Sequence, residues 1–362
     1  MKATADVAIV GGGVIGLALA RELSSRGIDV VVIERGRTGE EASWAAAGLL
    51  TPQSDALASS PFFAIARESR DLYPGWTDGL LEETGIDVGW RRTGVLRCGS
   101  AESLERFSWQ FAAGLPLERV EGSELAGLSA GRIAAGISHA LFFPSDAVVD
   151  TRLLVRALRR SLDLRAIAVL EGVPVTRFRI EAGECHGVDT PEGPVHADRV
   201  VDAAGAWANL DPGLPFAIPV EPVRGQIVEL VDQAPFPTVL ESEDVYLVPR
   251  SDGRVLVGAT VERTGFRKDV TAEGVANLLR AALELAPSLG GARFSTAWAG
   301  LRPGTPDGLP LLGESPIRGL YLAAGHFRNG ILLAPITALL LSNLLRGGAP
   351  RDLSPFSPGR FG

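Results

Sequence analysis

Three side chains in the C-terminal part of the sequence have the chemistry to bind a small carboxylate. Arg302 follows the aromatic and apolar segment Trp298–Leu301, and a guanidinium in such surroundings needs an anionic partner because an unpaired buried charge is costly. Its planar fork of N–H donors matches the two oxygens of a carboxylate. Tyr246 opens the segment YLVPR and Arg328 lies in GHFRNG, so a hydroxyl and a second cation are available for the same anion. Taken alone, these residues are equally compatible with structural ion pairs and a core tyrosine.

The N-terminal segment contains residues of the types that hold a dinucleotide. An apolar run suited to a buried strand covers Val7–Val10. It is followed by a G-x-G-x-x-G pattern made by Gly11, Gly13 and Gly16. The first glycine permits a tight turn, the second lets a pyrophosphate approach the backbone, and the third lets the following helix pack closely on the strand. The pattern predicts a nucleotide-binding turn of the Rossmann type.

The elements after these glycines complete a strand–helix–strand unit. A helix beginning near Val14 would direct free N–H groups and the positive end of its dipole at the phosphates. The second strand, Ile28–Ile33, ends in Glu34, at about the 20-residue spacing expected of the acid that bonds a ribose hydroxyl. An acid here disfavours the 2′-phosphate of NADP, although the neighbouring Arg35 weakens that exclusion. Because strand, glycines, helix and acid occur in order, the unit favours a dinucleotide site over a glycine-rich turn of another α/β protein.

Length, charge and cysteine content narrow the class of protein. The chain has 362 residues, more than one hydrophobic core usually serves, so two domains are expected. The formal net charge is −8, without a block of basic residues, which argues against a nucleic-acid partner. Cys98 and Cys185 are too few and too far apart for a disulfide framework, and this cysteine usage fits a cytoplasmic protein.

Four further patterns imitate functional signals and are set aside. The N-terminal apolar run is broken by glycines and lacks the features of a signal peptide. The apolar segment Ile331–Leu345, interrupted by Pro335, is shorter than a membrane span of ~20 residues and predicts a buried helix. Residues 127–131 match the G-x-S-x-G of a nucleophile elbow, but a helix rather than a strand is expected before them. The four histidines, His139, His186, His196 and His326, lack metal-ligand spacing.

Periodicity and turn residues outline the remaining elements. Helices are expected over residues 61–84, 151–162 and 271–285, and strands over residues 94–98, 140–143, 172–178, 225–231, 246–249, 254–260 and 319–324. The fold class is therefore α/β with an α+β second domain. We expect a nucleotide-binding domain made from residues 1–85, 145–214 and 299–362. A second domain, built on a largely antiparallel sheet, is expected from residues 86–144 and 215–298.

Five segments together resemble a known family. These are SWAAAGLL (43–50), YLVPR (246–250), VGAT (257–260), WAGLRPGTPDG (298–308) and GHFRNGILLAP (325–335). They are similar to the FAD-dependent glycine oxidases of thiazole (thiamine) biosynthesis, in the superfamily of D-amino-acid oxidase and sarcosine oxidase. The resemblance implies a Rossmann-like FAD-binding domain interleaved with a substrate domain whose antiparallel sheet covers the flavin.

The family also implies roles for particular residues. Arg302 would bind the substrate carboxylate through two hydrogen bonds, assisted by Tyr246 and Arg328. Ala204 and Gly205, small residues that end the run VVDAAG, are expected against the cofactor. The other residues expected to hold FAD are Gly11, Gly13, Val14, Ile15, Gly16, Glu34, Arg35, Ala42, Ser43, Ala47, Gly48, Leu49, Val175, His326, Phe327, Arg328, Asn329, Gly330, Ile331 and Leu332.

The resemblance implies oxidative deamination of a small amino acid, with glycine first and sarcosine or small D-amino acids as further candidates. Hydride transfer from Cα to N5 of FAD would give a 2-oxo acid, ammonia and, with dioxygen, hydrogen peroxide. Sarcosine oxidases attach their flavin to a cysteine near the position of Gly300, so non-covalent FAD is expected here. The family further suggests a homotetramer.

Some positions depart from the family, and other functions compete. Trp44 replaces a residue that is often small, and Asp244 and Val261 stand near the expected substrate pocket where members carry His and Met. The alternatives are an FAD-dependent dehydrogenase or an oxidase of another amine. A flavin enzyme that modifies tRNA is disfavoured by the acidic charge, and an inactive FAD-binding scaffold is disfavoured by the intact Arg302, Tyr246 and Arg328.

Overall fold

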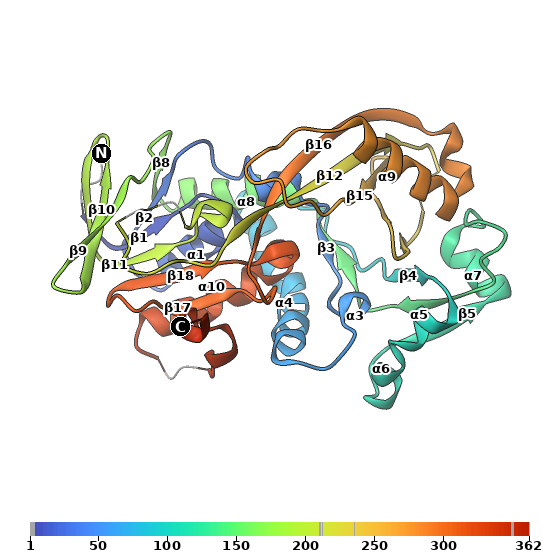
Figure 1. The fold of residues 1–362 in the computed structure, drawn as a ribbon, viewed down its shortest axis with the longest axis horizontal. Coiled ribbons are helices and arrows are strands. Elements are labelled where there is room, and N and C mark those ends of the chain that lie inside the picture. The colour runs from blue at the N-terminus through green and yellow to red at the C-terminus, as the bar shows by residue number, and fades with distance from the viewer. Residues whose placement is uncertain (1–3, 210, 212, 235, 349–350, 362) are drawn as a thin grey trace.

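The computed structural model describes residues 4–209, 211, 213–234, 236–348 and 351–361. Two sheets of eight strands each, here called sheet A and sheet C, form the two ends of the molecule (Figure 1). A third sheet pairs β3 (Leu49–Leu50) with β7 (Ala147–Val148) between them. The α/β fold class with a largely antiparallel second sheet is confirmed.

Sheet A contains the predicted nucleotide-binding strands. Its strand order is β17-β18-β11-β1-β2-β8, and β9 and β10 extend it from β11 as a meander. Strands β18, β11, β1, β2 and β8 run parallel to one another, whereas β17 pairs with β18 in the antiparallel sense. The bounds are β1 (Thr4–Val10), β2 (Val30–Glu34), β8 (Ala168–Glu171), β9 (Arg177–Glu181), β10 (Glu184–Thr190), β11 (Gly193–Asp202), β17 (Leu311–Glu314) and β18 (Leu320–Ala324).

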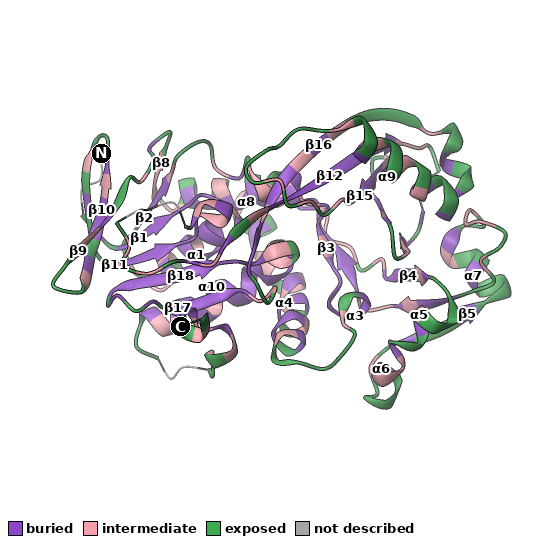
Figure 2. Cartoon of the chain, in the orientation of Figure 1, coloured by how far each residue is buried: buried purple, intermediate pink, exposed green. Residues whose placement is uncertain are grey.

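Both faces of sheet A are buried, which explains its nearly continuous apolar strands. Val7 and Ile9 of β1 belong to the core on the helical side, while Ala8 and Val10 belong to the core on the side of the β9–β10 meander. The helices of the first side are α1 (Val14–Ser25), α4 (Pro61–Thr84), α8 (Thr151–Leu164) and α10 (Gly330–Leu345). Figure 2 shows the central strands of sheet A, such as β1 and β18, as mostly buried.

Helix α10 is the apolar helix expected in the core. Pro335 lies within it and cannot donate to the carbonyl one turn earlier. Two side chains of α4 bind carbonyl groups in this region: the Tyr73 hydroxyl donates to the oxygen of Ile331, and Ser69 Oγ donates to that of Leu332 at 2.6 Å. Within the described residues, one helical stretch, Phe327–Leu345, is long and apolar enough to cross a membrane, and 67% of that stretch is buried inside the protein. The prediction of a buried core helix is confirmed.

Sheet C has the strand order β16-β12-β15-β14-β13-β4-β6-β5. All neighbours are antiparallel except β13 and β4. The bounds are β4 (Val95–Cys98), β5 (Glu118–Glu121), β6 (His139–Phe143), β12 (Glu221–Val231), β13 (Val239–Glu241), β14 (Tyr246–Pro249), β15 (Arg254–Gly258) and β16 (Arg293–Gly304). Helices α5 (Ala101–Glu105), α6 (Ser108–Ala112), α7 (Gly122–Ser129) and α9 (Ala272–Leu285) surround it (Figure 1).

Short elements complete the structure. They are α2 (Ala42–Ala45), α3 (Pro52–Asp55) and the 3-10 turns η1 (Gly205–Trp207), η2 (Pro287–Gly291), η3 (Phe327–Asn329), η4 (Ser354–Phe356) and η5 (Pro358–Phe361). The chain alternates between the two sheets, and β16 of sheet C crosses the boundary expected at residue 298. We keep the predicted division into domains as a proposal.

One predicted strand is wrong. Residues 173–176, expected within a strand over 172–178, form a loop between β8 and β9. Pro174 lies in this stretch and has no N–H to donate to a strand ladder. The loop instead brings Pro174, Val175 and Thr176 to the wall of the central cavity.

Candidate active site

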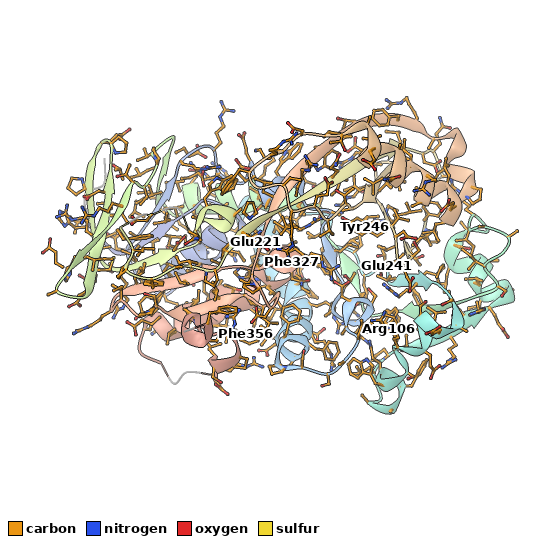
Figure 3. All side chains as sticks on the ribbon, in the orientation of Figure 1. Arg106, Glu221, Glu241, Tyr246, Phe327 and Phe356 are labelled. Atoms are coloured by element: carbon orange, nitrogen blue, oxygen red, sulfur yellow. The ribbon has the colours of Figure 1, made fainter. Side chains whose placement is uncertain are left out.

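A cavity of about 460 Å³ joins the carboxyl end of sheet A to the inner face of sheet C. It begins at the turn after β1 and extends to side chains of β13, β14 and β16. Ligands of open α/β sheets bind outside the carboxyl ends of the strands, which is where this cavity starts. Tyr246, Glu241 and Phe327 are labelled in the central part of Figure 3, where the two halves of the molecule meet.

The turn between β1 and α1 leaves space at the backbone for a ligand. Gly11 has a φ of +107°, and a Cβ there would lie 2.4 Å from the carbonyl oxygen of Ala203. Only glycine fits this position. Gly13 precedes α1 in extended conformation with no side-chain cap, so its bare backbone faces the cavity. Gly16 does not line the cavity; a Cβ there would lie 2.0 Å from the oxygen of Gly11, which is the close helix–strand packing expected of the third glycine.

Polar side chains stand at this turn. Ser43 Oγ accepts a hydrogen bond from the N–H of Val14 at 3.0 Å. The Glu34 carboxylate accepts from the N–H of Gly12 at 2.7 Å and of Gly36 at 2.8 Å. The guanidinium of Arg35 stacks at 3.6 Å on the ring of Trp207, which also lines the cavity. This arrangement places an acid and a hydroxyl at the N-terminus of α1, the part of a helix that favours anions.

The structure brings almost all predicted cofactor residues to this one cavity. Those that line it are Gly11, Gly13, Val14, Ile15, Glu34, Arg35, Ala42, Ser43, Ala47, Gly48, Leu49, Val175, Ala204, Gly205, His326, Phe327, Arg328, Asn329, Gly330 and Ile331. Leu332 does not: it is buried in the helical core and its carbonyl accepts from Ser69. The prediction that Leu332 contacts the cofactor is therefore not supported by its position.

The other end of the cavity contains the predicted carboxylate-binding residues. Arg302 Nη1 donates to the backbone oxygen of Thr260 at 2.9 Å, and the guanidinium hydrogen-bonds the Tyr246 hydroxyl. The guanidinium lies directly over Gly225, where a Cβ would come within 2.2 Å of it. Burial lowers the pKa of Arg302 from its usual value, and it raises the pKa of Tyr246. At neutral pH the site therefore combines a charged guanidinium with a neutral phenol.

The 3-10 turn η3 and the start of α10 form a further wall. Phe327 adopts a φ of +46°, and Arg328 is exposed while it lines the cavity. His326 is buried and hydrogen-bonds Thr337 at 3.1 Å through Nε2. Burial lowers its pKa to about 3, so His326 is neutral at physiological pH.

Sequence reasoning missed several lining residues. Glu241, Asp55, Trp207 and Gly225 all face this cavity but lie in segments without a nucleotide or arginine motif. The strand β13 that carries Glu241 was not predicted, because three residues are too few for a periodic pattern. The short segment that contains Asp55 likewise has no sequence motif that would identify this acid as a site residue.

The residues noted as departures from the family do not line the cavity. Asp244 faces a separate cavity of about 290 Å³ beside α9, and the side chain of Val261 is 60% exposed. Trp44 packs edge-on against Trp298 and stacks with Arg152, so its ring also lies outside the cavity wall. Asp244 shares its cavity with Thr260, whose carbonyl oxygen accepts from Arg302, and Val261 follows Thr260 in the chain. A role of Asp244 and Val261 near the substrate pocket therefore stays a prediction.

The patterns set aside are not sites in the structure. Ser129 is fully buried at the end of α7, and its hydroxyl donates to the carbonyl of Leu125 at 2.7 Å, so it cannot act as a nucleophile. His139, His186 and His196 are exposed. Over the described part of the chain, no group of three or more histidine, cysteine or acidic side chains could hold a metal ion. Cys98 and Cys185 are free and buried.

Comparison with known proteins assigns the family. A family model described as FAD dependent oxidoreductase matches residues 6–344. The chain belongs to this family. A glycine oxidase of Pseudomonas putida is 38% identical over 363 residues, covering 99% of each chain. The crystal structure of glycine oxidase from Geobacillus kaustophilus superposes with a TM-score of 0.94 at 37% identity, over 99% of both chains. The bifunctional protein ThiO/ThiG of Synechocystis sp. is 39% identical, over 100% of this chain and 55% of its own length.

These relatives confirm the resemblance to glycine oxidases that the sequence segments indicated. The chain is a glycine oxidase-like, FAD-dependent oxidoreductase. The residues at the β1–α1 turn fit such a cofactor, because the backbone of Gly13 lines the cavity without a side chain and Glu34 provides an acceptor.

The contact between Gly225 and Arg302 yields a first prediction. Replacing Gly225 with alanine should displace the guanidinium, because its Cβ would lie 2.2 Å from Arg302 Nη1 and the long side chain can move more easily than β12. We expect the KM for the amino-acid substrate to rise about tenfold, since the paired hydrogen bonds depend on this position, with unchanged flavin content. Steady-state kinetics measures the KM, and the visible spectrum measures the flavin content. Gly127→Ala, at a site with no atom within 4 Å of the added Cβ, is the control, and equal KM values in both variants would contradict the prediction.

Proposed function

We propose that this protein catalyses the oxidative deamination of a small amino acid, with glycine as the first candidate and sarcosine and small D-amino acids next. Glycine, dioxygen and water would yield glyoxylate, ammonia and hydrogen peroxide. FAD, when bound, would supply the hydride-accepting chemistry and the subsequent two-electron reduction of dioxygen. The support comes from the glycine oxidases that match the whole chain and from the arginine at the end of the cavity.

Arg302 carries the proposal. Among the described residues, no acidic side chain forms an ion pair with its guanidinium; its partners are the carbonyl of Thr260 and the hydroxyl of Tyr246. A half-buried guanidinium without a carboxylate partner favours binding of an anion. The part of the guanidinium not used by Thr260 would bind the substrate carboxylate, with the Tyr246 hydroxyl donating to the same group and Arg328 adding positive charge nearby.

The other end of the cavity would hold FAD. Gly11 and Gly13 would allow the pyrophosphate to reach the N-terminus of α1, and Glu34 would accept from a ribose hydroxyl. The loop at Val175 and the small residues Ala204 and Gly205 would enclose the nucleotide from the β9–β11 side. Holding the substrate carboxylate at a fixed place would direct Cα and the amine to the flavin, and this orientation is the main contribution of the protein.

The site requires no general base for this chemistry. His326 is neutral at physiological pH but buried against Thr337, so it is not placed to accept a proton from a substrate amine. An amine that arrives deprotonated needs no proton acceptor before hydride transfer. The apolar lining formed by Ala45, Ile227 and Ile331 would disfavour the charged ammonium form.

The deciding experiment measures flavin reduction and hydrogen peroxide release by the purified yellow protein with glycine, sarcosine, D-alanine, D-proline and L-alanine. Peroxide formed from glycine or sarcosine would support the proposal and rank the substrates. Anaerobic reduction of the flavin without peroxide in air would assign a dehydrogenase. If none of these amines reduces the flavin, the proposal is wrong.

We further predict that the flavin is bound without a covalent bond. Position 300 is glycine, and even a Cβ there would come within 2.5 Å of Ala45 Cβ, so this strand offers no thiol to the isoalloxazine. After acid precipitation, the yellow colour should remain in the supernatant, where absorbance and mass spectrometry identify free FAD. Flavin that stays in the pellet and adds its mass to a peptide would contradict this. The homotetramer and the cytoplasmic location also stay predictions.

A further inference from the structure

Glu241 faces the proposed substrate site from the strand next to Tyr246. In the antiparallel pairing of β13 and β14, Glu241 is directly opposite Tyr246, and side chains so paired have Cβ atoms about 5 Å apart on the same face of the sheet. Both residues line the cavity, and Figure 3 shows them in neighbouring positions. The carboxyl group therefore stands one strand beyond the tyrosine that contacts Arg302.

Charged groups of both signs lie near the phenol of Tyr246. Arg302 and Arg328 both act on the phenol as nearby cations, whereas Asp55 acts on it as a nearby anion. Asp55 is exposed and also lines the cavity. The cavity wall around Tyr246 thus carries two guanidinium groups, Arg302 and Arg328, and two carboxyl groups, Glu241 and Asp55.

Arg97 holds Glu241 in place without entering the cavity wall. Its Nη1 lies 2.9 Å from Glu241 Oε1, and the two side chains are 17% and 15% exposed. Arg97 pairs with Glu241 in the register of β4 and β13 and stacks over Phe107, but it does not line the cavity. Burial and the neighbouring Asp55 raise the pKa of Glu241 to about 7, against the lowering effect of Arg97.

We propose that Glu241, together with Asp55, determines which substituents the substrate can carry: neutral and cationic groups are accepted and a second carboxylate is rejected. The inference rests on the proposed function, in which Arg302 binds the first carboxylate. Because Glu241 is paired with Tyr246 and both acids line the same cavity, a ligand held by Arg302 and Tyr246 would come near Glu241 and Asp55. A second carboxylate at that place adds negative charge beside two acids in a partly dry cavity, where like charges repel strongly. An ammonium or an N–H group gains a hydrogen-bond acceptor instead.

If Glu241 had only a structural role, its replacement would have a different effect on ligand binding. If the carboxylate only balanced Arg97, its replacement would lower stability and leave the charge preference of the cavity unchanged. The experiment therefore measures charge preference through binding of ligands that lack an α-amine, so that it does not depend on turnover.

The test uses isothermal titration calorimetry on the FAD-loaded protein with propionate, 3-aminopropionate and malonate. The three ligands share one carboxylate and differ in the charge of the other end. In the wild type we expect 3-aminopropionate to bind about tenfold more tightly than malonate, a difference of roughly 1.4 kcal/mol. Glu241→Gln should reduce this ratio to about one, because it removes a carboxylate from the cavity and leaves the charge of Arg97 uncompensated. Propionate, which carries a single carboxylate, should bind somewhat more tightly for the same reason.

Two further variants keep the test decisive. Asp55→Asn removes a charge from an exposed side chain without leaving a buried arginine unpaired, and it should lower the ratio about threefold, because an exposed charge is better screened by water. Glu229→Gln is the matched control, because Glu229 is also a buried glutamate beside an arginine. Its Oε2 lies 3.6 Å from Arg254 Nη1, and its Oε1 accepts a hydrogen bond from Ser295 Oγ at 2.8 Å. Glu229 does not line the cavity. It should keep the wild-type ratio.

The outcomes separate this inference from the proposed function. If amines reduce the flavin and propionate binds, but the preference for 3-aminopropionate is absent or survives in both Glu241→Gln and Asp55→Asn, the inference alone is overturned. If none of the three ligands binds and no amine reduces the flavin, the proposed function fails and the inference fails with it.

Discussion

Replacement of Arg302 by alanine is expected to lower kcat/KM for the amino-acid substrate by about 100- to 1000-fold, mainly through KM. Removing one partner of a buried charge-assisted pair costs roughly 3–4 kcal/mol. Nothing else on the wall replaces the guanidinium fork, because Arg328 is exposed and Tyr246 offers a single hydroxyl. Flavin content should stay at the wild-type level, since Arg302 lies at the end of the cavity away from the β1–α1 turn. Steady-state kinetics and the visible spectrum measure both quantities.

Two companion variants identify the cause. Arg302→Lys keeps the charge but loses the planar fork, and we expect about a tenfold loss, between wild type and alanine. Arg132→Ala removes another largely buried arginine of the same half of the molecule, paired with Asp232, and should lower stability without changing KM. Normal kinetics in Arg302→Ala would remove the basis of the carboxylate assignment.

The second large effect is expected at the nucleotide end. Gly13 has an ordinary φ of −76°, so a valine there is compatible with the backbone. Its Cβ would meet only Ser43 Oγ at 3.3 Å, and its methyl groups would occupy the space in front of α1 where a pyrophosphate binds. We expect FAD affinity to fall about 100-fold, which corresponds to roughly 3 kcal/mol of steric and lost hydrogen-bond energy. Titration of the apoprotein with FAD measures this affinity.

A graded control separates a steric effect on FAD binding from an effect on folding. Gly13→Ala should weaken FAD binding less than Gly13→Val, because its single methyl group extends less far into the cavity. Circular dichroism should show the same helix content in both variants. Retention of bound FAD by Gly13→Val at the wild-type level would mean that the pyrophosphate does not lie at this turn.

Local sequence patterns were sufficient to predict several helices and strands. The helix expected over 61–84 is α4, whose first turn is capped by Ser60 and which ends at Gly85 in the left-handed conformation. These are signals carried by neighbouring residues, so they can be recognised without knowledge of the rest of the chain. The loop at 173–176 shows the converse. Val173 and Val175 suggested a strand, but Pro174 and the proximity of the cavity determined a different path.

The sequence by itself indicated the nucleotide-binding turn, the acid at Glu34 and the buried helix α10, because each depends on short-range spacing or composition. Arg302 was singled out through the resemblance of its segment to a known family. Only the tertiary structure showed that Glu241 and Asp55 line the same cavity as Tyr246, and that Asp244 and Val261 do not line it. The side chain that a strand presents to a cavity depends on its register with its neighbours. That register, Glu241 opposite Tyr246 and Gly225 beneath Arg302, arises from contacts between segments far apart in the chain.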